Sequence, residues 1–165
     1  MPVDAAPLLT IWVDADACPR LLRDLLIKTS DRHRLPLVFV ANQPLGIAPS
    51  GLIRTLQVES GADRADAEII ARCQPGDLVV SQDIPLAAQA VEKGAVVISP
   101  RAELLDASTV RARLHLRDYM DMLRGSGVQT GGPRPMTAND RKQFADLLEK
   151  TVQRLQRQAR LRPGR

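Results

Sequence analysis

The chain has 165 residues, a length typical of one domain, and 44% of them are hydrophobic, which is enough for a substantial core. Five of its 23 basic residues lie in residues 151–165, which contain no acid. The formal net charge of +4 therefore comes from this C-terminal segment, and the rest of the chain is close to neutral. No stretch approaches the roughly 18 consecutive apolar residues of a membrane span. The first nine residues also lack the basic start and apolar core of a signal peptide.

The two cysteines, Cys18 and Cys73, have no CxxC spacing and form no recognisable zinc pattern with the two histidines. We expect both to be reduced thiols of a cytoplasmic protein. Cys18 comes just before Pro19, close to an expected helix start, where a thiol pKa is often lowered. With no histidine nearby in sequence, packing is the simpler interpretation of Cys18.

Short apolar runs alternate with helical patterns over residues 8–99. Apolar runs rich in β-branched residues predict strands buried on both faces, and apolar residues three and four apart predict helices. The expected strands are residues 8–13, 37–41, 53–58, 78–80 and 95–99; the expected helices begin at Pro19 and cover residues 65–73 and 84–92. This alternation indicates βαβ units and hence a three-layer α/β fold with a mostly parallel sheet of about five strands.

The last third of the chain is expected to add two C-terminal helices. One covers residues 109–124, and the other runs from an N-cap at Thr137 to about Arg160, with Asp140 in its first turn. The Gly-rich residues 125–133 predict a flexible connection between them. We therefore expect a loose leader over residues 1–9, one α/β domain over residues 10–150 and a basic tail over residues 151–165, the tail being a solvated helix end.

Polar and acidic residues follow several of the expected strands. Because ligands of open α/β sheets bind beyond the carboxyl ends of the strands, these residues are candidates for a functional site. By position along the chain they are Asp14 and Asp16 after the first strand, Asn42 after the second, Asp66 and Glu68 early in the helix before the fourth, and Ser81 and Asp83 after the fourth. Asp77 precedes its strand and is expected at the opposite edge.

Several carboxylates in one crevice repel one another unless protons or cations compensate. Mg²⁺ or Mn²⁺ would do so, because hard cations bind carboxylates, water and phosphate oxygens. Asp14, Asp66 and Asp83 are the expected metal ligands, and such a site would activate water for phosphoryl chemistry. Asp16 and Glu68 are expected to act through water or to orient the nucleophile.

Each of these residues also has a structural interpretation. Asp16, Asp83 and Asp63 are placed where aspartates cap helices, and the early helical acids Asp66 and Glu68 suit the helix dipole. Asn42, Ser81, Thr130 and Arg117 are candidate substrate-binding residues. Thr130 belongs to a Thr-Gly-Gly stretch that could present N–H groups to phosphate or form only a mobile loop. Arg117 could reach into the acidic crevice or pair with Asp118 and Asp121 on its own helix.

Seven ordered motifs resemble the YaiI/YqxD-type bacterial family. They are Ile11–Pro19, Val40–Gln43, Ala65–Ile69, Gly76–Val80, Asp83–Ala87, Arg117–Asp121 and Gln129–Pro133. That family is grouped by similarity with PIN-like domains, including NYN-type domains, many of which are metal-dependent ribonucleases. The resemblance implies a PIN-like domain over residues 10–150, with Asp14, Asp66 and Asp83 in the places of the PIN-like acids. The pattern departs in one respect: NYN-type domains often have a second Asp two positions after the acid at Asp83, where this chain has Pro85.

Three functions remain open at this stage. The first is a Mg²⁺- or Mn²⁺-dependent nuclease that acts on RNA. The second is a non-catalytic RNA-binding module whose tail arginines contact the phosphate backbone. The third is a haloacid-dehalogenase-type phosphatase with Asp14 as nucleophile and Asp16 as acid/base, although Cys18 replaces the Thr or Val usual in that motif. No membrane partner is expected, and the sequence does not predict the oligomeric state.

Overall fold

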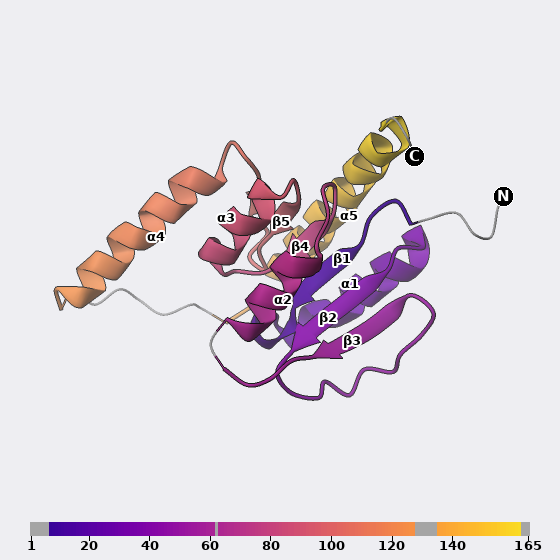
Figure 1. Cartoon of the computed structure of the whole chain (residues 1–165), viewed down its shortest axis with the longest axis horizontal. Helices are drawn as coiled ribbons and strands as arrows, with labels where there is room; N and C mark the ends of the chain where they lie inside the picture. Colours follow the sequence, from indigo (N-terminus) through magenta and orange to yellow (C-terminus); the bar gives the residue numbers. More distant parts are fainter. Residues whose placement is uncertain (1–6, 62, 128–134, 163–165) are drawn as a thin grey trace.

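The computed structural model describes residues 7–61, 63–127 and 135–162 (Figure 1). Its centre is a six-stranded sheet of order β3-β2-β1-β4-β5-β6. All neighbouring pairs are parallel except β5 and β6, which are antiparallel. The strands are β1 Ile11–Asp14, β2 Leu37–Ala41, β3 Ile53–Gln57, β4 Leu78–Val80, β5 Val96–Ile98 and β6 Leu104–Leu105.

The strand order reverses between β1 and β4, the two central strands. The chain leaves β1 toward β2 and β3 on one side, and returns to β4 and β5 on the other. Asp14 ends β1 beside Val40 of β2, while Val13 pairs with Val80, the last residue of β4. Residues that follow β1 and β4 therefore meet at the switch point of the sheet, where α/β proteins bind ligands.

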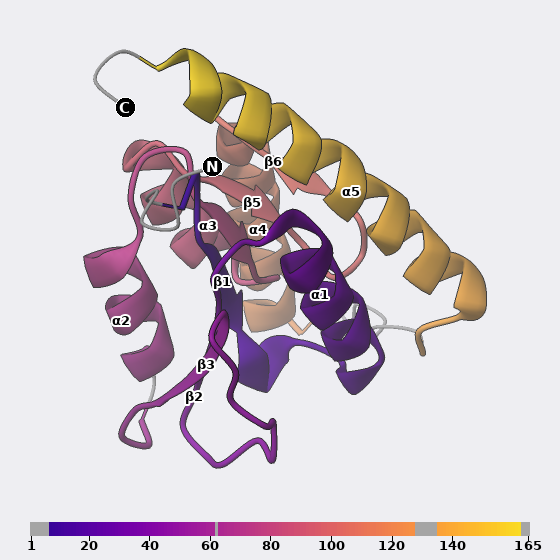
Figure 2. The same ribbon diagram turned by 90° about the vertical axis from the view of Figure 1, so that its right-hand side faces the viewer.

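Helices cover both faces of the sheet and make three layers (Figure 2). Phe39 packs with α1 and α5 in one apolar cluster, and Val38 packs with α2 and α3 in another, as expected for neighbouring strand residues that point to opposite faces. The elements are the 3₁₀ helix η1 Ala15–Ala17 and the α-helices α1 Arg20–His33, α2 Arg64–Arg72, α3 Ile84–Glu92, α4 Val110–Gly125 and α5 Ala138–Leu161.

The expected fold class is confirmed, and the structure adds one strand to it. β6 contains only Leu104 and Leu105, too short a run to be told from a loop by periodicity. It forms because the Ser99 hydroxyl accepts the N–H groups of Arg101 and Glu103 and turns the chain back on β5. Antiparallel edge strands of this kind are common on otherwise parallel sheets.

The two ends of the domain are more firmly packed than the sequence predicts. Leu9, assigned to the loose leader, is 3% exposed. The expectation of a solvated helix end over residues 151–165 is wrong for residues 151–161, because α5 continues through them and buries Val152, Leu155 and Ala159. The predicted N-cap is confirmed: Thr137 and Asp140 form a reciprocal capping box.

Asp77 lies at the amino edge of the sheet, as expected from its position before β4. Its carboxylate accepts hydrogen bonds from the Thr10 N–H at 2.9 Å, the Trp12 indole at 3.0 Å and the Gln74 N–H at 2.8 Å. These bonds tie the starts of β1 and β4 together. Asp77 therefore has a structural role, away from the residues that follow the strands.

The helix α4 stands away from the rest of the molecule in Figure 1 and has no fully buried residue. It packs through its first half, where Val110 and Leu114 contact the cluster around α3. Within the part of the chain that the structure describes, none of the helices has the length and apolar character needed to cross a membrane.

Candidate metal centre

Three carboxylates gather at the carboxyl edge of the sheet. Asp63, Asp66 and Asp83 each offer one oxygen, and these oxygens all lie within 4.8 Å of one another. Asp63 directly precedes α2, Asp66 lies in the first turn of α2, and Asp83 follows β4 at the N-cap of α3. Two of the three, Asp66 and Asp83, were expected metal ligands from the sequence; Asp63 was not.

Asp63 occupies the N-cap position of α2, yet its side chain makes no capping hydrogen bond. The expectation that it is simply a helix cap is therefore wrong. Its backbone is left-handed, with φ 64°, a conformation that Asp adopts more readily than most residues. The carboxylate joins the acids of α2 and α3, an arrangement that sequence spacing alone does not reveal.

Asp83 both caps a helix and belongs to the acid group. Its Oδ1 accepts the N–H of Leu86 at 3.0 Å, which fixes the side chain at the start of α3. The structural and functional interpretations of Asp83 are thus compatible, because a carboxylate has two oxygens that together accept several partners.

Asp14, the third metal ligand expected from the sequence, is not one of these three acids and is 7% exposed. Its Oδ2 accepts the Ser81 hydroxyl at 3.1 Å, and the same hydroxyl accepts the Asp83 N–H at 3.0 Å. Ser81, proposed from sequence to bind substrate, is only 1% exposed. It therefore links the end of β1 to the end of β4 and positions Asp14 and Asp83 relative to each other.

The acid group is electrostatically strained. Burial, reinforced by the charges of Asp83, Asp14 and Asp63 and by a hydrogen bond with Asp83, raises the pKa of Asp66 to about 7. Burial also raises the pKa of Asp14, with further increases from Asp83 and Asp16 that the Ser81 hydroxyl partly offsets. Perturbed carboxyl groups in a cleft are a common property of functional sites.

One arginine faces the acids across a cavity of about 340 Å³. Arg117 of α4 lines this cavity together with Asp63, Asp66 and Asp83. On its own helix Arg117 also pairs with Asp118 at 3.2 Å and Asp121 at 3.3 Å. The sequence left two interpretations of Arg117 open, a surface ion pair and an arginine at the acidic crevice. The structure is consistent with both, because Arg117 pairs with acids on its own helix and also lines the cavity.

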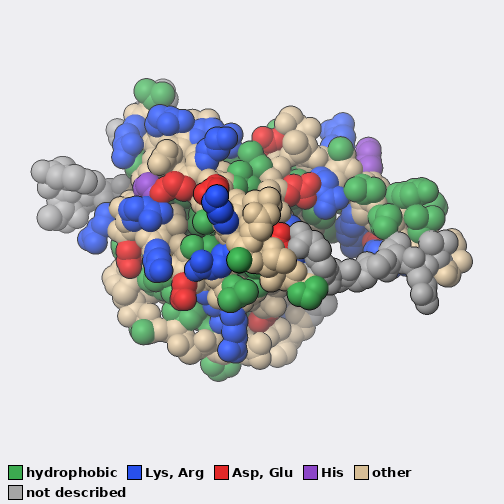
Figure 3. Space-filling view, turned by 180° about the vertical axis from the view of Figure 1, so that it is seen from behind, with side chains coloured by type: hydrophobic (Ala, Val, Ile, Leu, Met, Phe, Trp, Pro, Cys, Tyr) green, Lys and Arg blue, Asp and Glu red, His purple; other side chains and the backbone are tan. Residues whose placement is uncertain are grey.

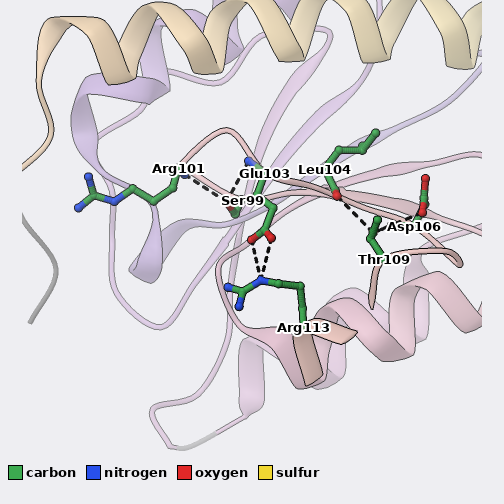
Figure 4. Close-up of polar contacts among 7 residues, drawn as sticks. All are labelled: Ser99, Arg101, Glu103, Leu104, Asp106, Thr109 and Arg113. Carbon is green, nitrogen blue, oxygen red and sulfur yellow. Dashed lines mark hydrogen bonds and ion pairs between the residues drawn. The ribbon is translucent and has the colours of Figure 1, made fainter. Parts of the chain in front are cut away.

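The start of α4 is fixed by the β5–β6 turn (Figure 4). Arg113 contacts both carboxylate oxygens of Glu103, at 2.9 and 2.7 Å, and the Thr109 hydroxyl donates to the Leu104 carbonyl at 3.3 Å. Arg113 lies one helical turn before Arg117. The contacts at the start of the helix therefore determine where Arg117 lies against the cavity.

The remaining candidates have other surroundings. Asp16 accepts the Asn42 N–H at 2.9 Å, so it holds the end of β2, and the expectation that it caps the next helix is wrong. Glu68 pairs with Arg72 at 2.6 Å on the surface of α2. Burial raises the pKa of Cys18 to about 12, consistent with packing. Thr130 lies outside the described residues.

Comparisons with known proteins assign the chain to a family. Residues 12–154 match the family described as "Uncharacterized BCR, YaiI/YqxD family". The chain belongs to this family. It is 56% identical over 142 residues to a UPF0178 protein of Acinetobacter baylyi, covering 86% of this chain and 92% of that protein. It is 52% identical over 149 residues to the UPF0178 protein YaiI of Escherichia coli O81, covering 90% of this chain and 98% of that protein.

The family resemblance drawn from the seven motifs is thus confirmed. No solved structure matches the chain. The three-carboxylate group lies inside the matched residues, as do α4 and most of α5.

Proposed function

We propose that Asp63, Asp66 and Asp83 bind a divalent cation, Mg²⁺ or Mn²⁺, and that the protein is a metal-dependent nuclease acting on RNA. The observation that carries this proposal is the convergence of three carboxylate oxygens within 4.8 Å of one another at the switch point of the sheet. Oxygens that share one Mg²⁺ are at most about 4.2 Å apart, because each bond is about 2.1 Å. Small side-chain movements are therefore enough to close the site on a cation.

The donor set suits a hard cation. All three side chains offer oxygen, and one or two carboxylates with several waters are usual for Mg²⁺ at phosphate-processing sites. A bound cation would lower the pKa of a coordinated water and neutralise negative charge on a phosphate oxygen. The carboxylate of Asp14, held by Ser81 behind Asp83, adds negative charge next to the site.

Arg117 gives the site a second element suited to phosphate. Arg117 lines the same cavity as the three acids, and arginine pairs with phosphate oxygens through two parallel hydrogen bonds. The acids would hold the cation and its water, while Arg117 would hold the phosphodiester. The resemblance to PIN-like ribonucleases, through Asp14, Asp66 and Asp83, supports RNA as the substrate.

The phosphatase alternative has less support from the geometry. It requires Asp14 as an open nucleophile and Asp16 as a mobile acid/base. Asp14 is 7% exposed and accepts the Ser81 hydroxyl, and Asp16 holds the backbone of Asn42. The non-catalytic alternative depends on the cations of α5 and is tested separately below.

The variant Asp83→Asn gives a sharp test of the metal site. Asn keeps an oxygen that can accept the Leu86 N–H, so the cap of α3 is retained while one charge is removed. We expect Mn²⁺ binding, measured by isothermal titration calorimetry at pH 8, to weaken at least tenfold. We also expect Mn²⁺-dependent cleavage of a fluorescein-labelled 20-nucleotide single-stranded RNA to be lost.

Asp146→Asn is the matched control, because it removes one charge from an exposed position of α5. Control and wild-type protein should bind Mn²⁺ and cleave RNA alike. Metal binding without cleavage of RNA by the wild-type protein would reject the nuclease while leaving the metal site. Equal Mn²⁺ affinity in wild type and Asp83→Asn would reject the metal site itself.

A further inference from the structure

The C-terminal half of α5 carries a row of cations. Lys150, Arg157 and Arg160 are exposed, and Arg154 is partly exposed. At 100° per residue, these four positions fall within an arc of about 120° on the helix. Residues 150–162 contain no acid, and Figure 3 shows Lys and Arg side chains gathered over this end of the molecule. We call these four residues the α5 cation row.

None of the four forms an ion pair with a described residue. Other cations nearby do: Arg32 of α1 pairs with Glu149 at 2.7 Å. Members of the row are three or four residues apart, the spacing at which like charges on a helix repel. The row is therefore a surface on which an added polyanion relieves repulsion.

The row lies away from the acid group. The first turn of α5 is near the carboxyl edge of the sheet, where Arg141 Nε donates to the Leu21 carbonyl. Its last turn is at the amino edge, where Arg162 Nη1 donates to the carbonyl of Pro75, before β4. The acid group follows β4 instead. One ligand phosphate therefore does not reach both places.

We propose that the α5 cation row is a docking surface for the phosphate backbone of a nucleic acid. From Lys150 to Arg160 the helix rises about 15 Å, at 1.5 Å per residue. Successive phosphates of one strand in a duplex are about 3.4 Å apart along the axis, so this length faces about four of them. This surface is separate from the three carboxylates, so the proposal that it binds nucleic acid does not depend on the proposed nuclease activity.

The contacts of this surface are to phosphate rather than to bases. The chain has only four aromatic residues, and none is exposed on α5: Phe144, the one aromatic of that helix, is fully buried. Base stacking is therefore absent from the row, and binding should not depend on base sequence.

A lipid surface fits the row less well than a nucleic acid. A helix that binds a membrane interface needs an apolar face to insert. On this part of α5 the apolar side chains Val152, Leu155 and Ala159 are buried against the domain, leaving Leu161 at the end. The exposed side of the row offers charge and little apolar area.

The test compares the wild-type protein with a variant that neutralises the whole row, Lys150→Gln/Arg154→Gln/Arg157→Gln/Arg160→Gln. Gln has a helix propensity close to that of Lys and Arg, so α5 should persist. Fluorescence anisotropy with labelled 20-nucleotide single-stranded RNA and single-stranded DNA, in EDTA, measures binding between 50 and 200 mM KCl. Each neutralised phosphate contributes about −0.7 to the slope of log K against log salt for single strands.

The expected result is at least a tenfold loss of affinity at the lowest salt and a slope shallower by about 3. The matched control Lys28→Gln/Arg54→Gln/Arg111→Gln/Lys142→Gln has the same net charge and removes four exposed cations outside the row, three from other elements and Lys142 from the first half of α5. This control variant should lose much less affinity for the RNA and DNA strands than the row variant does. Equal loss on RNA and DNA identifies the shared backbone as the ligand; loss on RNA alone assigns it to RNA, which equally supports the row.

Three results would overturn the proposal. One is unchanged affinity and slope in the row variant. Another is an equal loss in the control, which would mean that only net charge matters. The third is a row variant that loses binding to vesicles containing phosphatidylglycerol but keeps its RNA affinity. Unaltered Mn²⁺-dependent cleavage by the row variant separates this surface from the proposed active site.

Discussion

At the scale of single residues, Asp66 is the most perturbed carboxyl of the proposed site. Its pKa of about 7 exceeds the ordinary value of 3.8 because burial and the acids around it disfavour its ionised form. Below pH 3.8 folded and unfolded chains both hold the proton. Between pH 3.8 and 7 the unfolded chain releases it first, so the free energy of unfolding falls as pH rises and levels off above pH 7.

Asp66→Asn should remove this decline. In EDTA, urea denaturation should show a variant more stable than wild type at pH 8 and equal to it at pH 3.5. Mg²⁺ should raise the melting temperature of the wild-type protein at pH 8, because a cation compensates the ionised acids, and should raise that of the variant much less. A variant whose pH profile is parallel to that of wild type would contradict this account of Asp66.

The buried hydroxyl of Ser81 connects Asp14 with the backbone of Asp83. Ser81→Ala removes a donor from one and an acceptor from the other, in a site that is 1% exposed. We expect a loss of about 1–3 kcal/mol in the free energy of unfolding, the usual cost of leaving buried polar groups unpaired. Ser60→Ala, at an exposed position, should change it by less than about 0.5 kcal/mol in the same urea titration.

The acids of the site were only partly predictable from sequence. Asp66 and Asp83 were identified because each lies where the topology of a parallel sheet predicts a ligand site. Asp63 was missed, since its carboxylate joins them through a left-handed backbone conformation that no pattern of apolar residues reveals. The capping interpretation of Asp16 failed for a similar reason: its partner, the Asn42 N–H, is 26 residues away in sequence.

At the scale of elements, α4 determines where Arg117 lies. Glu103→Gln should weaken the contact with Arg113 that fixes the start of this helix. Both side chains are partly exposed, so the stability change should stay below about 1 kcal/mol. The rate of Mn²⁺-dependent RNA cleavage should fall by up to about fivefold as Arg117 loses its position.

Arg111→Gln, an exposed change on the same helix, is the control for charge and helix propensity. It should cleave RNA at the wild-type rate. If Glu103→Gln also cleaved at that rate, the anchoring of α4 would have no part in placing Arg117.

Strands and helices were largely predictable because each has one consistent pattern of apolar residues along its length. The pattern is a continuous apolar run in most strands and a spacing of three or four residues in the helices. Continuous apolar runs predicted four of the five parallel strands, β1, β2, β4 and β5, and their buried residues confirm them. β3 has one buried residue, Ile53, and lies at the edge of the sheet, which explains its weaker apolar pattern. The sixth strand could not be predicted, because two leucines pair with β5 only through a turn that Ser99 stabilises.

At the scale of the whole molecule, the acid group and the α5 cation row lie toward opposite edges of the sheet. The acid group follows β4, whereas the α5 cation row ends near the turn that precedes it. The sequence alone places the arginines in a tail and gives no position for them relative to the acids. Their position follows from the packing of α5 along the domain, which carries residues 151–161 back across the sheet.

This packing also determines how the role of the arginines must be tested. Deleting residues 151–165 would remove Val152 and Leu155 from the core along with the arginines, so loss of RNA binding in that truncation would not identify the residues responsible. Point substitutions separate the two roles, because Leu155 is 2% exposed while Arg157, two residues on, is exposed.

Leu155→Ala should lower the free energy of unfolding by about 2–5 kcal/mol, the cost of a cavity in a packed core. Arg157→Gln should change it by less than about 0.5 kcal/mol. Urea denaturation at pH 7 and 150 mM KCl measures both. If both variants changed the free energy of unfolding by equally small amounts, the end of α5 would be only loosely packed. The arginines would then belong to a mobile tail, as expected from the sequence. A large loss confined to Leu155→Ala would establish that the domain holds α5 in place, so that any RNA contact of its arginines occurs at a fixed position on the amino edge.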